Sequence, residues 1–94
     1  MSIPASASPA TENERIAFVT TAPKEADFEC SFTAIYLQAT EDCHIAVDRA
    51  ANSGDFLIKK NEFCHLEKVQ GTRISAIGDS TNGTLYIMVS RAAK

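Results

Sequence analysis

The chain has 94 residues, of which 45% are hydrophobic and 22% are charged, and its net charge is −3 at pH 7. This length fits a single domain, and the hydrophobic content is too high for a wholly disordered chain. Acidic and basic residues are interspersed without a basic stripe, and no apolar run is long enough to span a bilayer. We therefore expect a small globular protein whose partners include neither nucleic acid nor membrane.

Residues 1–13 differ in composition from the rest of the chain. They are rich in serine and alanine and include Pro4 and Pro9, so they offer little surface to bury. We expect a flexible N-terminal arm over residues 1–13 and a folded domain over residues 14–94. The arm is either a frayed terminus or a segment that becomes ordered on a partner, with Ile3 and Pro4 as its anchors. Because it lacks the basic start and apolar run of a signal peptide, we expect synthesis in the cytosol.

The folded part is a series of short β-type runs separated by turn signals. β-Branched and aromatic residues are frequent in these runs, and no helical period extends beyond one turn. The expected strands lie at residues 15–20, 28–39, 43–48, 55–59, 62–69, 74–77 and 84–89. About seven short strands with such spacing predict an all-β domain, a single small antiparallel β-sandwich or barrel.

The C-terminal part shows the clearest strand period. Apolar residues fall on every second position before and after a polar loop, residues 78–83, which ends in Asn-Gly. We expect an antiparallel hairpin there, with a chain reversal at Gln70-Gly71 before it. The expected core consists of Leu85, Ile87 and Val89 together with Ile35, Leu37, Ile45 and Val47.

Two of the expected strands carry apolar side chains on both faces. By strict alternation, the second apolar face consists of Phe32, Tyr36, Tyr86 and Met88. A two-layer protein needs only one apolar face per sheet. The second face is either ordinary surface or a subunit interface, where tyrosine, phenylalanine and methionine are enriched.

Two Cys-His dipeptides, Cys43-His44 and Cys64-His65, are the one pattern that resembles a metal site. Neighbouring strand residues point to opposite faces, so each dipeptide can offer at most one ligand to a common site. A catalytic cysteine would also need a histidine oriented by a third group, which no motif here supplies. We expect half-buried cysteines, solvated histidines, no metal, no cofactor and no enzymatic activity.

A longer succession of segments runs from Ile35 to Arg91. It reads IYLQAT, CHIAV, an Ala-Asn-Ser-Gly connection, FLIKKNEFCHLEKV and GTRISAIGDSTNGTLYIMVSR. Its most specific part is the ending, in which ISAI is followed by GTLYI. This succession resembles the small β-sandwich virion proteins of tailed bacteriophages, in particular head decoration (cement) proteins.

The resemblance implies a structural virion protein that is made in the host cytoplasm and lies on the capsid exterior. Its expected partner is the major capsid protein, its expected form is a homotrimer, and its role is capsid stabilisation. The subunit interface would then be Phe32, Tyr36, Tyr86 and Met88, and the capsid-contacting arm would use Ile3, Pro4 and Pro9. The alternative is a phage tail or fibre module, or a carbohydrate- or receptor-binding β-sandwich. The loops at residues 49–54 and 78–83 contain no aromatic residue for sugar stacking, which favours the decoration role.

Overall fold

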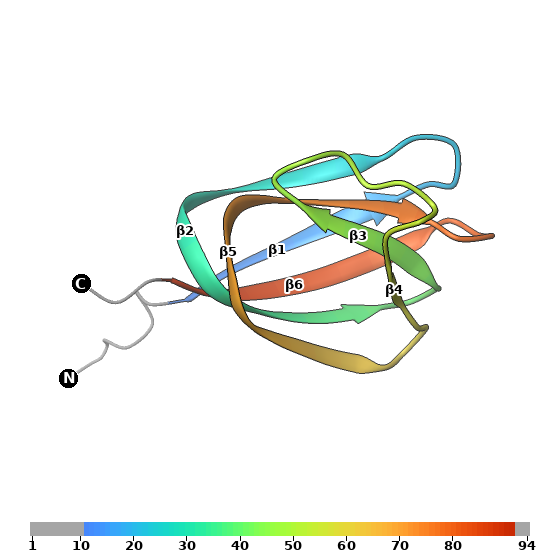
Figure 1. Ribbon diagram of the computed structural model, residues 1–94. Helices are drawn as coiled ribbons and strands as arrows, with labels where there is room; N and C mark the ends of the chain where they lie inside the picture. Colours follow the sequence, from blue (N-terminus) through green and yellow to red (C-terminus); the bar gives the residue numbers. More distant parts are fainter. Residues whose placement is uncertain (1–10, 92–94) are drawn as a thin grey trace.

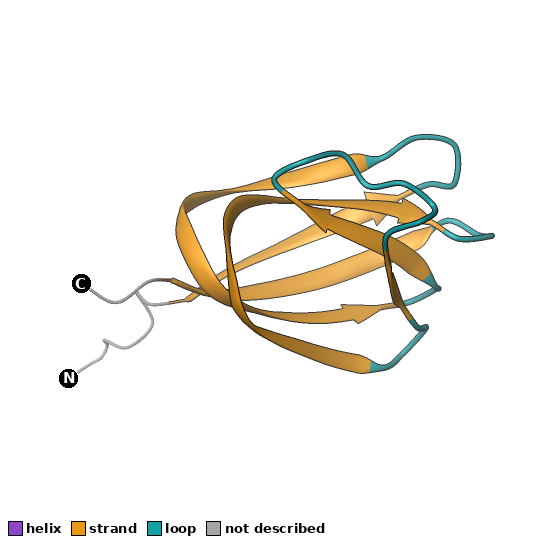
Figure 2. Cartoon of the chain, viewed as in Figure 1, coloured by secondary structure: helices purple, strands orange, loops and turns teal. Residues whose placement is uncertain are grey.

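The computed structural model describes residues 11–91, which form six antiparallel strands and no helix (Figures 1 and 2). The strands are β1 (Thr11–Phe18), β2 (Lys24–Ala39), β3 (Cys43–Val47), β4 (Phe56–Ile58), β5 (Phe63–Gly78) and β6 (Gly83–Arg91). The predicted all-β class is confirmed. The count is six because two of the expected runs, residues 62–69 and 74–77, belong to one continuous strand, β5.

The sheet order is β1-β6-β2-β5-β3-β4, and the sheet folds over itself into two layers (Figure 1). β2 and β5 have 16 residues each and contribute to both layers. Layer A consists of β1, β6, residues 32–39 of β2 and residues 63–71 of β5. Layer B consists of residues 24–27 of β2, residues 73–78 of β5, β3 and β4. One sheet therefore produces a sandwich whose two layers share their longest strands.

The fold-over occurs where the pairing of β2 with β5 is interrupted. Asp27 pairs with Arg73, but the next pair is Phe32 with Gly71, so several residues of β2 lie outside the ladder. β5 is irregular at the same level, where Lys68 has a φ of 61°. Extra residues bend a strand and increase its twist, and here both long strands bend together.

The predicted reversal at Gln70-Gly71 is a bend within β5 instead. The carboxylate of Asp48 holds it, because Oδ1 accepts hydrogen bonds from the backbone N–H groups of Thr72 at 3.0 Å and Arg73 at 3.1 Å. This partner lies 24 residues away in sequence. Local turn signals therefore located the change of direction but could not distinguish a turn from a bent strand.

Gly71 lies at this bend and is closely approached by Val47 and Asp48. A Cβ atom there would lie 2.5 Å from Cγ1 of Val47 and 3.0 Å from Oδ2 of Asp48. We expect Gly71→Ala to lower the free energy of unfolding by about 1–3 kcal/mol, because the neighbours must shift. Gly54→Ala is the control, since its Cβ would meet only the side chain of Asn52, at 3.3 Å. Urea denaturation would compare the two, and equal losses would contradict the close approach at Gly71.

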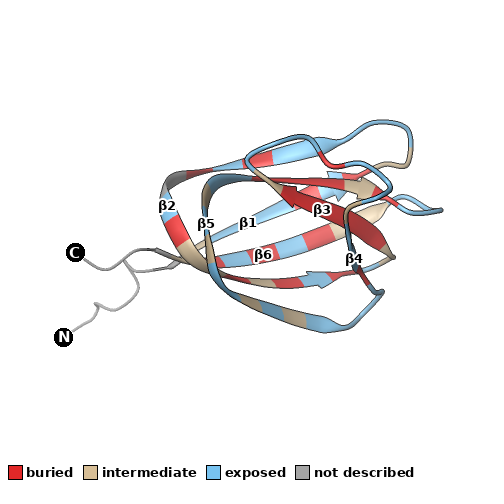
Figure 3. Ribbon diagram, viewed as in Figure 1, coloured by how far each residue is buried: buried red, intermediate tan, exposed pale blue. Residues whose placement is uncertain are grey.

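The core lies between the layers and includes the residues that alternation predicted (Figure 3). The predicted core residues are buried except Val47, which is partly buried and packs against the core. Figure 3 shows the corresponding alternation of buried and exposed residues along β6. The strand period therefore identified the inner face correctly wherever the ladder is regular.

Phe32 corrects the prediction of the second apolar face. It has no exposed surface, and its ring packs edge-on against Phe28 with centroids 5.5 Å apart. The pairing of β2 with β6 shifts by one residue between Phe32 and Ala34, so alternation does not continue through Thr33. This bulge turns Phe32 into the core, which rules it out as an exposed interface residue.

β1 also corrects the predicted boundary of the N-terminal arm. It begins at Thr11, and residues 11–13 pair with Ser90, Val89 and Met88 of β6. A strand ladder depends on backbone groups, so polar residues can extend it without apolar side chains. The remaining arm residues, including Ile3, Pro4 and Pro9, lie outside the described residues.

Candidate interaction surface

The outer face of layer A carries four large apolar or aromatic side chains, which we call the aromatic face. They are Tyr36 of β2, Phe63 of β5, and Tyr86 and Met88 of β6. The exposed fractions of Phe63, Tyr86 and Met88 are 66%, 49% and 38%, and Tyr36 is half-buried. These are among the most exposed large apolar side chains in the described part of the chain.

The strand register brings these four residues together. Tyr36 lies opposite Met88 on one side and His65 on the other, so their side chains share one face. Gln38, two residues along β2, lies between Tyr86 and Phe63 in the same way. Side chains opposite each other on a sheet face are close enough to pack. Two adjacent cross-strand rows therefore form a continuous surface over three strands.

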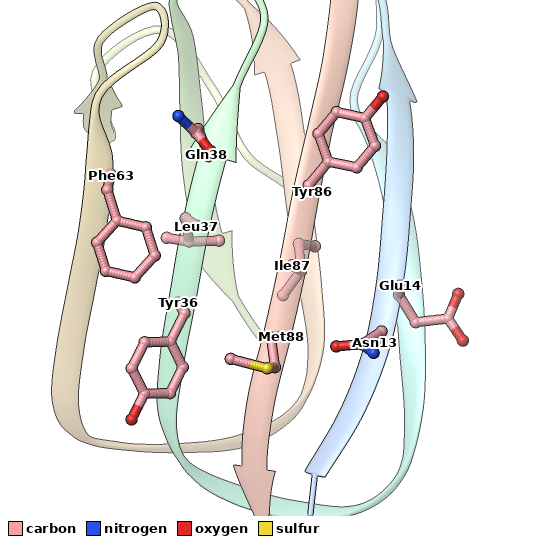
Figure 4. Close-up of a pocket in the computed structure, with 9 residues that line it drawn as sticks. All are labelled: Asn13, Glu14, Tyr36, Leu37, Gln38, Phe63, Tyr86, Ile87 and Met88. Carbon is pink, nitrogen blue, oxygen red and sulfur yellow. The ribbon is translucent and has the colours of Figure 1, made fainter.

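Tyr36 is held by its neighbours on β5. Its ring stacks on the His65 ring with centroids 4.2 Å apart, and the Phe63 ring lies 6.0 Å away. Figure 4 shows Phe63 and Tyr36 on one side of a shallow groove and Tyr86 and Met88 on the other. The groove has a volume of about 260 Å³. Leu37 and Ile87 line it between these two pairs of side chains. Most of the residues that line the groove are apolar or aromatic, so it presents a mainly apolar surface to other molecules.

The structure thus places three of the four predicted residues of the second apolar face together, namely Tyr36, Tyr86 and Met88. Phe32 does not belong to this face, whereas Phe63 does and was not predicted from the sequence. The available signal was strand alternation: Phe63 falls on the face opposite Cys64 and Leu66, and the structure packs those two residues against the core.

Two further exposed apolar side chains lie on β4. Phe56 and Leu57 are 53% and 39% exposed, whereas the next residue, Ile58, is buried. Leu57 lies opposite His44 and Phe56 opposite Ile45 in the pairing with β3. Phe56 is therefore on the same face of β4 as Ile58, and Leu57 is on the opposite face, so they do not form one surface. β4 lies in layer B, at the opposite end of the strand order from β1.

The residues of the two Cys-His dipeptides are separated by the strands that carry them. Cys43 lies in the core, where burial raises the pKa of its thiol to about 12, and burial also raises the pKa of Cys64. His44 projects from the other face of β3, and His65 stacks on Tyr36 in layer A. Over residues 11–91, no three His, Cys, Asp or Glu side chains are grouped so that they could hold a metal ion. A buried thiol and a partly buried thiol, both with raised pKa values, are poor nucleophiles.

His44 corrects the expectation of a solvated side chain, because it is 7% exposed. Two loops cover it: Nδ1 lies 2.9 Å from the carbonyl oxygen of Asp55, and Nε2 lies 2.8 Å from Oδ1 of Asp79. The β3–β4 loop is itself fixed, since Arg49 Nη1 donates to Asp55 Oδ2 at 2.9 Å and Ala51 N donates to Ser75 Oγ at 3.0 Å. The ion pair with Arg49 holds the pKa of Asp55 at about 2.

The His44 arrangement favours the charged imidazolium. Each ring nitrogen faces an oxygen acceptor, and only the doubly protonated ring can donate to both. The pKa of His44 is accordingly raised, first by the hydrogen bond to the Asp55 carbonyl and then by the Asp79 carboxylate. The interaction therefore joins two loops to β3 more strongly at low pH than at high pH.

We expect the contribution of His44 to stability to be lost as pH rises. Its pKa is higher in the folded state than the ordinary value of 6.5, so the contribution is complete below about pH 6.5 and disappears above the folded-state pKa. The measurement is urea unfolding of wild type and His44→Gln at a series of pH values, in which the difference between them should shrink toward high pH. Asp79→Asn, which keeps a hydrogen-bond acceptor without the charge, should reduce this pH dependence. An identical pH profile for wild type and His44→Gln would contradict the assignment.

Comparison of the sequence with protein-family models and with curated proteins gives no match. Within the described strands and loops there is no helix of the length and hydrophobicity needed to cross a membrane.

Proposed function

We propose that this protein is a capsid decoration (cement) protein that binds the outer face of a phage head as a homotrimer and stabilises the shell. The observation that carries the proposal is the aromatic face. The core is already filled by side chains from the inner faces of the two layers, yet Tyr36, Phe63, Tyr86 and Met88 remain on an outer face. Tyrosine, phenylalanine and methionine are the residues that subunit interfaces favour.

The proposed role is mechanical and needs no cofactor or catalytic group. A ligand that binds only the assembled form of a structure stabilises that form by its binding free energy. A trimer that engages three capsid sites at once binds far more tightly than one copy, even where each contact is weak. The aromatic face holds the trimer together, and the N-terminal arm, through Ile3, Pro4 and Pro9, contacts the major capsid protein.

The proposal is tested on particles of the phage that encodes the chain, prepared with and without this protein. Heads that lack it should keep their shape but release DNA at a lower temperature, and adding purified protein should restore the wild-type release temperature. A variant lacking residues 1–10 should bind bare heads more weakly while remaining a trimer. Cryo-electron microscopy of the wild-type particle should show the protein on the head exterior. If the protein is found in purified tails alone, and bare heads are equally heat-resistant, the tail or fibre alternative replaces this proposal.

A further inference from the structure

His44 links β3 to two loops that differ in how firmly they are held. The β3–β4 loop, residues 48–55, offers the backbone carbonyl of Asp55 to Nδ1 at 2.9 Å. The β5–β6 loop, residues 79–82, offers the carboxylate of Asp79 to Nε2 at 2.8 Å. The imidazolium can donate to both acceptors at once, whereas the neutral ring has a single N–H group. Deprotonation of His44 therefore forces a choice between the two loops.

The carbonyl of Asp55 is held in place by the loop that carries it. Arg49 Nη1 donates to Asp55 Oδ2 at 2.9 Å, and the backbone N–H of Asn52 donates to the same oxygen at 2.8 Å. The N–H of Asp55 donates in turn to the carbonyl of Asn52 at 3.0 Å. The Asp55 side chain is 11% exposed, so water reaches little of this anchor. If His44 withdrew its donor, the Asp55 carbonyl would face the lone pair of the ring nitrogen and could not turn away.

The carboxylate of Asp79 has water as an alternative partner. Its side chain is 46% exposed, and it stands at the first position after β5. A carboxylate that leaves the ring is hydrated, whereas a buried acceptor that loses its donor costs the free energy of its desolvation. The neutral ring should therefore keep its proton on Nδ1, for the Asp55 carbonyl, and present the lone pair of Nε2 to Asp79. Two acceptors that face each other without a proton repel, so Asp79 moves away.

Further hydrogen bonds hold the β5–β6 loop, and each is longer than the 2.8 Å contact between His44 and Asp79. They run from Thr81 Oγ1 to Glu41 Oε1 at 3.3 Å, from Thr20 N to Asn82 Oδ1 at 3.2 Å and from Asp79 N to the carbonyl of Asp42 at 3.1 Å. The first two are exposed to water. Loss of the His44 contact therefore removes the shortest of these links and leaves the loop on longer ones.

The groups around the ring set the direction of the pH dependence. Across β3, His44 lies opposite Leu57 of β4 and Ile77 of β5, which carry no charge. The charged groups belong to the flanking loops and turns; they are Arg49, Asp55 and Asp79 beside the ring, and Asp42 and Lys59, which pair with each other at 3.5 Å. The hydrogen bond to the Asp55 carbonyl, followed by the Asp79 carboxylate, raises the pKa of His44 above 6.5. Both loops are thus bound below about pH 6.5, and the change comes as pH rises past the folded-state pKa.

We infer that His44 is a proton-dependent latch for one loop: when the ring loses its proton, Asp79 is released and residues 79–82 become mobile, while the β3–β4 loop stays bound through Nδ1–H. The rest of the sandwich is unchanged, because the core lies on the other face of β3, where Cys43 and Ile45 are buried. The protein therefore carries a surface loop whose order is controlled by pH. This control does not require the proposed capsid role.

The test is NMR spectroscopy of the full chain over a series of pH values from about 6 upward, through the range in which histidine titrates. Backbone order parameters of residues 79–82 should fall from the about 0.85 of a rigid backbone toward the about 0.6 of a flexible one. Those of residues 49–55 should stay unchanged. The midpoint should coincide with the titration of the His44 ring, and ring nitrogen shifts above it should identify the Nδ1–H form. His65 is the other histidine of the chain, and His65→Gln should leave the midpoint unchanged.

Asp79→Asn distinguishes release by lone-pair repulsion from general loosening. The amide can accept from the imidazolium and can also donate to the lone pair of a neutral Nε2. Residues 79–82 of this variant should therefore stay ordered across the whole pH range, whereas those of Asp79→Ala should be mobile throughout. The inference is overturned if the wild-type loop stays ordered when His44 titrates, if residues 49–55 loosen with it or instead of it, or if the neutral ring carries its proton on Nε2. It is overturned as well if Asp79→Asn loosens at the same midpoint as the wild type.

Discussion

Replacing Phe32 with alanine is expected to lower the free energy of unfolding by about 3–5 kcal/mol, the usual cost of removing a buried phenylalanine. The side chain has no exposed surface, and it lies against Phe28 at the level where β2 passes from one layer to the other. The cavity left by the substitution would open where the ladder is already interrupted. Since small domains have a total stability of about 5–15 kcal/mol, the variant should be close to unfolding at ordinary temperature.

Thr33→Ala is the matched control for Phe32→Ala. Strict alternation would point Thr33 into the core and Phe32 outward. The bulge in β2 instead turns Phe32 into the core. Thr33 is partly buried and its hydroxyl donates to the carbonyl of Ser90 at 3.4 Å, so its loss should cost about 1 kcal/mol or less. Urea denaturation of both variants measures the difference. A cost below 1 kcal/mol for Phe32→Ala would mean that the outward assignment from strict alternation was correct.

The parts of the fold that the sequence predicted are those governed by local period. In β6 and β3, each apolar residue at every second position does face the core, because an uninterrupted ladder keeps the alternation. The loop between β5 and β6 was likewise predicted from its residues, but the predicted hairpin was wrong: β5 pairs with β2 and β3, β6 pairs with β1 and β2, and the loop joins two strands that are not paired with each other. Local composition is sufficient where the structure depends on neighbours in sequence.

The parts that the sequence could not give depend on contacts between distant residues. The bend in β5 needs Asp48, which has a φ of 60° and binds backbone groups more than 20 residues further along the chain. The burial of His44 needs the two loops that bring Asp55 and Asp79 to it. Neither contact follows from the period of one strand, because a period says which face a side chain occupies but not what covers that face.

The aromatic face depends both on the local strand period and on contacts between distant residues. Tyr86 and Met88 were assigned to the outer face by alternation along a regular strand, and the structure agrees. Phe32 was misassigned because one additional residue in β2 reverses the face of everything that precedes it. Phe63 lies on the aromatic face because the pairing of β5 with β2 places it opposite Gln38. These two residues are 25 positions apart in the sequence, so the period of one strand does not relate them.

Two adjacent residues of β6 are expected to separate folding from association. Ile87 is buried in the core, whereas Met88, the next residue, is 38% exposed on the aromatic face. Ile87→Ala should lower the free energy of unfolding by about 2–5 kcal/mol, because it removes buried methyl groups and leaves a cavity. Met88→Ala should cost about 0.5 kcal/mol or less in the monomer, as exposed positions usually do.

The dependence on protein concentration distinguishes the two effects. A protein that folds into a trimer gains stability as its concentration rises, because association favours the folded state. Ile87→Ala should lower the melting temperature by a similar amount at every concentration, with the concentration dependence preserved. Met88→Ala should match the wild type at low concentration and fall behind it at high concentration, because the trimer contact is weakened. Differential scanning calorimetry over a wide concentration range measures both, and Met88→Ala melting like the wild type at every concentration would remove Met88 from the subunit contact.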